Sequence, residues 1–160
     1  MSINRSGRGR YNKVMMYPQV RESARFFANA AIEAAKGRKP MDSLEMVQKE
    51  LSSNSVIYQM ITDGLESIDT DTEQAIAGFG QMSETQAALP GTIHLIAKYP
   101  NDLETAMIEN VMAGADSSAR GILSAFILGI CNGMDAIPKQ WMEDMRLVER
   151  IRSLAGISGM

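Results

Sequence analysis

Residues 110–141 read NVMAGADSSARGILSAFILGICNGMDAIPKQW, and this stretch decides the fold. A loop of small residues at 113–115 precedes the apolar segment 119–132, which is long enough for a helix of about three turns. Gly133 then ends that helix, and Pro138 begins a second one, because a proline at the first helical position loses no backbone hydrogen bond. We therefore expect an apolar helix, a short turn and a second helix.

The apolar helix at 119–132 is expected to be buried on most sides. Gly121, Ala125 and Gly129 recur every four residues and share one face, so another backbone can approach closely there. A helix that is apolar on most faces needs a sizeable helical body around it. The segment is too short to cross a bilayer, which takes roughly 18–20 apolar residues.

The overall composition is typical of a folded globular protein. With 160 residues, 45% of them hydrophobic, the chain can form one domain with a sizeable core. The net charge of −3 and the pI near 5.2 argue against a whole-molecule nucleic-acid binder. The polar, basic start has no apolar run typical of a signal peptide, and Cys131 is the single cysteine. We therefore expect a cytoplasmic protein without an internal disulfide.

The two ends of the chain lack apolar periodicity. Residues 1–16 carry four cations among glycine, serine and asparagine, which predicts a flexible basic arm. Charges this sparse favour a solvated terminus over a phosphate-binding segment that contacts RNA. The helical domain is expected over 17–155, and 156–160 is expected to fray.

Apolar residues recur every three or four positions along most of the chain, which predicts helices. No segment has the alternation of a strand, so the expected fold class is all-α, a helical bundle or array with short connections. The first expected helix is 18–37, with Val20, Ala24, Phe27, Ala31 and Ala35 inward, and the second starts at Asp42 with Glu45 as its capping-box partner. The next helices are expected at 56–65, up to Phe79 with Asp71 or Thr72 as the cap, from Leu89 and Pro90 onward, and after a cap at Asn101 or Asp102. A terminal helix is expected with Trp141, Met145, Val148 and Leu154 inward.

The single histidine, His94, lies off the apolar face of its predicted helix. One histidine cannot supply both a Ser-His-Asp arrangement and a metal site. We expect either a surface histidine or one whose hydrogen bonds are satisfied within the fold.

The 110–141 stretch resembles the ADP-ribosylglycohydrolase family. In that family a late loop of the form N-x-G-G-D-T-D-T opens a buried helix, followed by a small-residue turn and A-I-P-x-x-W. The matching positions are Asn110, Gly114, Asp116, Ala136, Ile137, Pro138 and Trp141. A variant G-G-D-S-x-x-R-G, from branches that include plant proteins and jellyfish lens crystallins, is more similar still, since Asp116, Ser117, Arg120 and Gly121 fit it.

The resemblance extends over roughly 17–145 and corresponds to the carboxy-terminal half of the family fold only. It implies the helical fold of that half. Family enzymes cleave ADP-ribose from modified targets with two Mg²⁺ ions, whose ligands come from an early T-D-D-T-type motif and from the late loop. The early motif has no counterpart in this sequence, because no aspartate precedes Asp42.

The late loop retains one clear metal ligand of the family pattern. Asp116 matches the first aspartate, whereas Ser118 stands in place of the second and Ala119 replaces the threonine that follows. The resemblance thus implies a metal-binding role for Asp116 and a weaker one for Ser118, and it leaves catalytic and substrate-binding residues unknown. A lone carboxylate is a poor Mg²⁺ site, so we expect no tightly bound metal in this chain alone. Asp116 can instead cap the helix, where Arg120 is placed to pair with it.

The remaining matched residues are expected to be structural, namely Arg120, Gly121, Pro138 and Trp141. A second string, D-T-D-T at 69–72, repeats the letters of the family's metal ligands. In the family, however, this segment is the ordinary start of a helix. We therefore favour helix capping over metal binding at 69–72.

Two functions follow from the resemblance, and whether the chain is an enzyme stays open. The first is a partial ADP-ribosylglycohydrolase-like hydrolase, a fragment or split-gene product that acts on an ADP-ribosylated substrate only when a missing amino-terminal half complements it. The second is a non-catalytic helical scaffold or binding protein derived from the family. An RNA-associated protein that uses the basic arm is a weaker third hypothesis.

The expected partners follow from the same reasoning. Helices made to pack against an absent half would expose an apolar patch, so we expect association into a homo-oligomer or with the missing half. We expect no membrane contact and no nucleic-acid partner.

Overall fold

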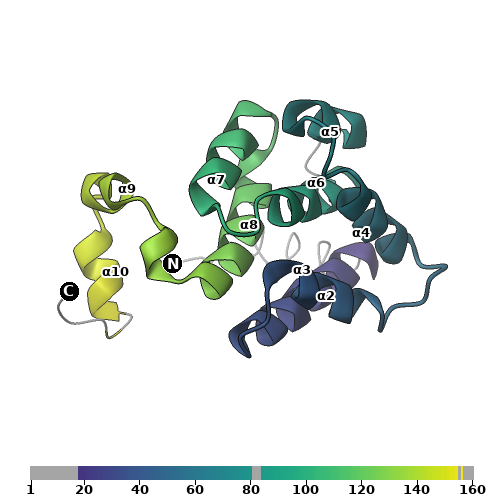
Figure 1. Ribbon diagram of the computed structural model, residues 1–160, viewed down its shortest axis with the longest axis horizontal. Coiled ribbons are helices and arrows are strands. Elements are labelled where there is room, and N and C mark those ends of the chain that lie inside the picture. The colour runs from purple at the N-terminus through teal and green to yellow at the C-terminus, as the bar shows by residue number, and fades with distance from the viewer. Residues whose placement is uncertain (1–17, 81–83, 155, 157–160) are drawn as a thin grey trace, which may run out of the picture.

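The computed structural model describes residues 18–80, 84–154 and 156, and every regular element in that part of the chain is helical (Figure 1). The predicted all-α fold is confirmed. The predicted basic arm at 1–16 lies outside the described residues, as does the predicted tail at 156–160 apart from Gly156. The elements are α2 (Pro18–Ala35), α3 (Pro40–Gln48), α4 (Val56–Glu66), α5 (Thr72–Phe79), α6 (Thr85–Lys98), α7 (Leu103–Met112), α8 (Ser117–Asn132), the 3₁₀ turn η1 (Met134–Ala136), α9 (Lys139–Asp144) and α10 (Val148–Leu154).

Helix α6 forms the centre of the helical body. Every residue from 89 to 97 is buried, and α4, α5 and α8 pack around this helix (Figure 1). The prediction that 119–132 would be buried on most sides is confirmed in part. On α8 the side chains of Ile122 and Phe126 are 71% and 53% exposed. These two residues share one stripe with the exposed Ser118, and the other residues of α8 are buried or half-buried.

Close helix packing depends on glycine at two positions. A Cβ atom on Gly64 of α4 would lie 2.6 Å from the carbonyl oxygen of Pro90, so α4 and α6 approach each other at backbone distance. A Cβ on Gly121 would lie 2.9 Å from Nδ2 of Asn110, so α7 approaches α8 closely there, but through a side chain and not through its backbone as predicted. Gly129 has no atom within 4 Å of such a Cβ, so the prediction is wrong there.

The helix starts that were predicted from local capping are confirmed at two places. Asp71 accepts from the backbone N–H of Gln74 at the start of α5, and Asp102 caps α7 in the same way. Two other starts are corrected. Helix α3 begins at Pro40 and has no side-chain cap, and α6 begins at Thr85, so that the proline expected to open it lies inside the helix. The buried contacts of α6 compensate for the backbone donor that a proline lacks.

The inward face of α2 differs from the predicted one. The buried residues are Phe26, Phe27, Ala30, Ala31 and Ala34, whereas the predicted Ala24 and Ala35 are exposed. The two phenylalanine rings meet edge to face with 5.4 Å between their centroids. Burial of both rings removes more apolar surface than the predicted alanine face would, so the helix is rotated to bury the pair.

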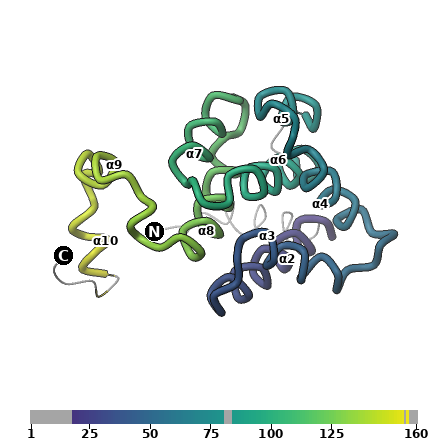
Figure 2. The backbone as a smooth tube through the Cα atoms, viewed as in Figure 1, coloured from purple at the N-terminus to yellow at the C-terminus, as the bar shows by residue number. Residues whose placement is uncertain are grey.

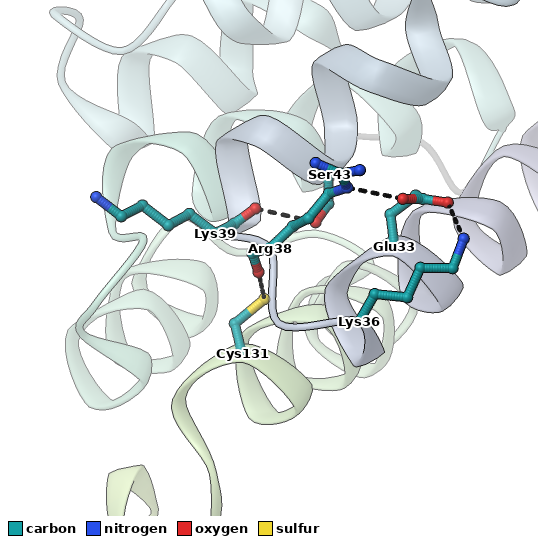
Figure 3. A network of polar contacts seen from close by, with 6 residues as sticks. All are labelled: Glu33, Lys36, Arg38, Lys39, Ser43 and Cys131. Atoms are coloured by element: carbon teal, nitrogen blue, oxygen red, sulfur yellow. Dashed lines mark hydrogen bonds and ion pairs between the residues drawn. The ribbon is translucent and has the colours of Figure 1, made fainter.

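Polar contacts fix the corner between α2 and α3 (Figure 3). Glu33 accepts hydrogen bonds from Lys36 Nζ at 2.6 Å and from Arg38 Nε at 2.8 Å, and the bond from Lys36 contributes most to lowering the pKa of this carboxylate. The thiol of Cys131, near the end of α8, lies 3.5 Å from the carbonyl oxygen of Arg38 and donates to it. Burial raises the pKa of this thiol. The corner and α8 are thereby joined.

Helices α9 and α10 stand away from the helical body (Figure 2). The terminal stripe was predicted to face inward, but Met145 is 45% and Leu154 is 79% exposed. A cavity of about 740 Å³ lies between η1, α9 and α10. No helix among the described residues is both long enough and apolar enough to cross a membrane.

Candidate functional site

The candidate site is the loop 113–116, which joins α7 to α8. Gly114 and Ala115 both have left-handed backbone conformations, with φ angles of 69° and 58°. Alanine rarely adopts this conformation, because its Cβ crowds the following carbonyl oxygen. Contacts from outside the loop must therefore hold the turn.

A buried arginine provides those contacts. Arg120 of α8 is 1% exposed, and its Nε donates to Asn110 Oδ1 at 3.0 Å. Its Nη2 donates to the carbonyl oxygen of Gly114 at 2.6 Å, and Asn110 Nδ2 donates to the carbonyl oxygen of Ser117 at 2.8 Å. Arg120 and Asn110 thus connect α7, the loop and the first turn of α8.

The electrostatics of Arg120 differ from the predicted ion pair with Asp116. No oxygen of Asp116 lies within 4.0 Å of the guanidinium, whose partners are neutral oxygens of Asn110 and Gly114. Burial lowers the pKa of Arg120, and the negative charge of Asp116 partly opposes that effect. Neutral oxygens therefore accept the hydrogen bonds of the guanidinium, and the carboxylate of Asp116 affects the pKa of Arg120 only from a longer distance.

Asp116 is the N-cap residue of α8. Its Oδ1 accepts from the backbone N–H of Ala119 at 3.5 Å and from the hydroxyl of Ser118 at 2.8 Å. A carboxylate at this position also complements the helix dipole. Ser118 is exposed and directs its proton towards Asp116.

The donor set of this loop does not fit a pair of magnesium ions. Mg²⁺ requires several oxygen ligands in nearly octahedral geometry. The loop offers one carboxylate, one hydroxyl that already donates to it, and the cationic side chain of Arg120 beneath the turn. Over residues 18–80, 84–154 and 156, no group of three or more His, Cys, Asp or Glu side chains could hold a metal ion.

The other residues singled out in the sequence lie at the edges of this site. Gly121 packs against Asn110 on α7. Pro138 is the N-cap residue of α9 rather than its first helical residue. Trp141 is 37% exposed and lines a hollow of about 390 Å³ together with side chains of α7, which are Met107, Ile108, Val111 and Met112.

Two supporting contacts were not predicted from the sequence. Gly91 of α6 leaves room for the side chain of Arg120, since a Cβ there would lie 3.0 Å from Arg120 Cδ. Ile76 of α5 belongs to a small buried cluster with Leu95 of α6 and Ala113 at the start of the loop. The burial of Asn110, at 2% exposed, also has no signal in sequence spacing. The contact between Arg120 and Gly91 can be recognised only when the relative positions of α6 and α8 are known.

The D-T-D-T string at 69–72 and His94 form a separate polar cluster. Asp71 caps α5, and Thr72 bonds to His94 and to Tyr99, so these side chains have partners within the fold. The expectation of a histidine with satisfied hydrogen bonds is confirmed, because both ring nitrogens of His94 have partners and the side chain is fully buried.

Comparison with known proteins gives one match. A family model described as ADP-ribosylglycohydrolase matches residues 16–158, which is most of the chain. No curated protein and no solved structure matches the sequence. The matched region includes the loop 113–116 and all the described helices. The chain belongs to the ADP-ribosylglycohydrolase family.

Proposed function

We propose that this chain is a partial ADP-ribosylglycohydrolase-like hydrolase that is inactive by itself. It contributes the late loop, with Asp116 as its single carboxylate, to a site whose other ligands come from a separate amino-terminal polypeptide segment. The observation that carries this proposal is the donor set of the loop, in which Asp116 is the single carboxylate and the hydroxyl of Ser118 already donates to it. ADP-ribosylated substrates would bind only after complementation.

The charge balance of the loop supports inactivity of the chain alone. A divalent cation near Asp116 would also face the positive charge of Arg120, which is buried and held by the loop carbonyl of Gly114. Mg²⁺ loses water reluctantly, so one carboxylate in such surroundings should not retain it tightly.

Complementation is the decisive experiment. ADP-ribose release from a modified protein would be measured with the full chain, with a candidate amino-terminal half that carries T-D-D-T, and with the two together. We expect release only from the mixture, and its loss in the Asp116→Ala variant. Asp69→Ala is the matched control, because Asp69 is exposed and lies outside the loop. Release by the chain alone would contradict the proposal.

Magnesium binding gives an independent readout. Calorimetric titration of the isolated chain should detect no site tighter than about millimolar, in keeping with a donor set of one carboxylate. A micromolar site that the Asp116→Ala substitution abolishes would show that the loop can hold the metal without a partner.

A second candidate function is a non-catalytic helical scaffold derived from the family. The observation that favours it is the Arg120–Asn110 network, which already satisfies the interior of the loop with hydrogen bonds. A scaffold of this kind would show no ADP-ribose release even with the complementary half, although the two could still associate.

Association is part of both proposals. Exposed apolar residues on α7 and α8, among them Val111, Met112 and Ile122, are candidates for the contact surface with an amino-terminal half or a second copy. Size-exclusion chromatography with light scattering would test this, and a clean monomer at high concentration would count against it. A cytoplasmic location stays a prediction.

A further inference from the structure

A continuous chain of hydrogen bonds, buried between His94 and Thr72 and part-buried at its two ends, joins three parts of the fold. The side chain of His94 on α6 has no exposed surface. Its Nδ1 lies 2.7 Å from Ser67 Oγ at the end of α4, and its Nε2 lies 3.2 Å from Oγ1 of Thr72, the first residue of α5. Thr72 Oγ1 lies 2.8 Å from the hydroxyl of Tyr99, which follows α6.

The direction of these hydrogen bonds follows from the number of protons. Ser67 has one hydroxyl proton and donates it to the carbonyl oxygen of Gly64 at 2.8 Å, because a carbonyl can only accept. Ser67 Oγ must then accept from His94, which places the ring proton on Nδ1. The bare Nε2 accepts from Thr72, and the Thr72 oxygen accepts from Tyr99.

We infer that this chain of hydrogen bonds is an acid-sensitive latch, which holds His94 as the neutral Nδ1–H tautomer and releases α5 from α4 and α6 when the ring takes up a proton. The proton comes from solvent and binds Nε2. Thr72 directs its hydroxyl proton to that atom in the neutral state, so the new N–H makes the Thr72 hydroxyl turn and accept from the ring, and Tyr99 must give up its bond to the Thr72 oxygen. Since Thr72 is the first residue of α5 and the charged ring has no exposed surface, this rearrangement acts on the start of that helix.

The surroundings of the ring make the charged form costly. Within α6, Lys98 disfavours the imidazolium, and from the N-cap of α5 Asp71 favours it. The groups that reach the ring from the end of α4 and from the turn after α6 are uncharged: the hydroxyl and the backbone of Ser67 and, through Thr72, the hydroxyl of Tyr99. The backbone contact with Ser67 raises the pKa of the ring. Burial dominates and lowers the pKa of His94 to about 4. The neutral latch is therefore the state of the folded protein at neutral pH.

The latch reaches the candidate site through α5. Ile76 of α5 belongs to a small buried cluster with Leu95 and Ala113, and Ala113 begins the loop 113–116. A Cβ on Gly91 would also touch both Ile76 and Arg120, which places α5 beside the side chain that holds the loop. Release of α5 removes the apolar support of Ala113.

Nitrogen NMR of the full, untagged chain tests the tautomer directly. His94 is the only histidine, so its two ring nitrogens give an unambiguous spectrum. At a pH well above the reference value of a free histidine, we expect the proton on Nδ1 and a bare Nε2. A proton on Nε2, or a spectrum averaged over both tautomers, would overturn the inference.

Amide hydrogen exchange of the same chain tests the release. The pKa of His94 is near 6.5 when α5 is open and about 4 when it is latched, so the open state takes up the proton at a higher pH. Lowering the pH from about 8 to about 5 should therefore raise the equilibrium constant for opening of α5 about 30-fold. The amides of α2, which shares no hydrogen bond with the ring, are the internal control. An α5 opening constant that is independent of pH would refute the latch.

Two threonine variants separate the latch from ordinary packing. Thr72→Val removes the hydroxyl that bonds the ring, and we expect faster exchange of α5 amides at neutral pH. Thr92→Val is the matched control, because Thr92 is equally buried but donates to Ala88 within its own helix. Equal effects of the two substitutions on α5 would count against the latch. Tautomer spectra of the wild-type chain remain decisive if Thr72→Val does not fold.

Discussion

The α4–α6 side of the molecule and the α7–α8 side differ in how fully they bury their apolar residues. Ile61 on α4 and Ile93 on α6 have no exposed surface, whereas Val111 on α7 is 64% and Ile122 on α8 is 71% exposed. Helices of similar hydrophobic character thus bury their apolar side chains on one side, with Val56 at the start of α4 as an exception, and leave several in solvent on the other. The first side has the character of a core, and the second has the character of an interface.

The strongest test of this comparison is to replace one glycine on each side by alanine and to compare the changes in stability. Gly64→Ala should destabilise the fold by about 3 kcal/mol, because its Cβ would lie 2.6 Å from the carbonyl oxygen of Pro90. Gly129→Ala on α8 has open space and should stabilise the helix by about 0.5–1 kcal/mol. Urea unfolding midpoints measure both, and equal shifts would mean that α4 and α6 do not approach as described.

Removal of the buried guanidinium should have the next largest effect. Arg120→Met leaves Asn110 Oδ1 and the carbonyl oxygen of Gly114 without their donor, at a cost of about 2–3 kcal/mol. Arg150→Met changes an exposed arginine and should shift stability by less than about 0.5 kcal/mol. Thermal unfolding would measure this difference. Similar losses in the two variants would mean that the Arg120 network contributes little.

The pH dependence of stability should carry the signature of His94. The folded pKa near 4 lies below the value of 6.5 that applies in the unfolded chain, so the unfolded state binds the proton more readily as the pH falls. The contribution is fully present above the unfolded pKa and is lost as the pH falls from there towards 4. Between about pH 7 and pH 5 the loss is about 2 kcal/mol.

The histidine contribution can be isolated by comparison with a variant that does not titrate. His94→Gln should flatten the stability profile between about pH 7 and pH 5 by the same amount, because the other titratable groups are retained. Parallel profiles of the two proteins over this range would rule out His94 as the source.

The smallest effect is expected on the exposed face of α8. At a concentration low enough to keep the chain monomeric, Phe126→Gln should change stability by less than about 0.5 kcal/mol, since the ring is 53% exposed in the single chain. Its neighbour Ile127 is fully buried, and Ile127→Ala should cost about 3 kcal/mol. If Phe126→Gln were the more damaging of the two, the face would be buried in solution by association. Sedimentation at several concentrations would detect that state.

Local signals in the sequence were enough to predict the fold class and several helix starts. Asp71 and Asp102 cap helices through their own side chains, and such contacts are encoded within three residues of the chain. The start of α6 was not predicted, because Pro90 is accepted inside a helix around which α4, α5 and α8 pack. Tertiary packing overrides the local preference there.

The candidate site could be found from the sequence, but its internal contacts could not. The loop and Asp116 were identified by their motif, and the capping geometry of Asp116 follows from its place before a helix. The partners of Arg120 are different, since sequence spacing suggested Asp116 and the structure directs the guanidinium to Asn110 and Gly114. Which oxygen a long side chain reaches depends on how α7 and α8 cross. The metal, the partner and the reaction stay predictions.

The left-handed turn of the loop 113–116 does not require glycine at position 115, because alanine adopts it there. A left-handed backbone favours glycine, yet alanine occupies position 115 with a φ of 58°. Arg120 donates to the carbonyl oxygen of Gly114, so a contact from α8 holds the left-handed turn although alanine occupies position 115. Ala115→Gly would therefore relieve backbone strain without changing the course of the loop.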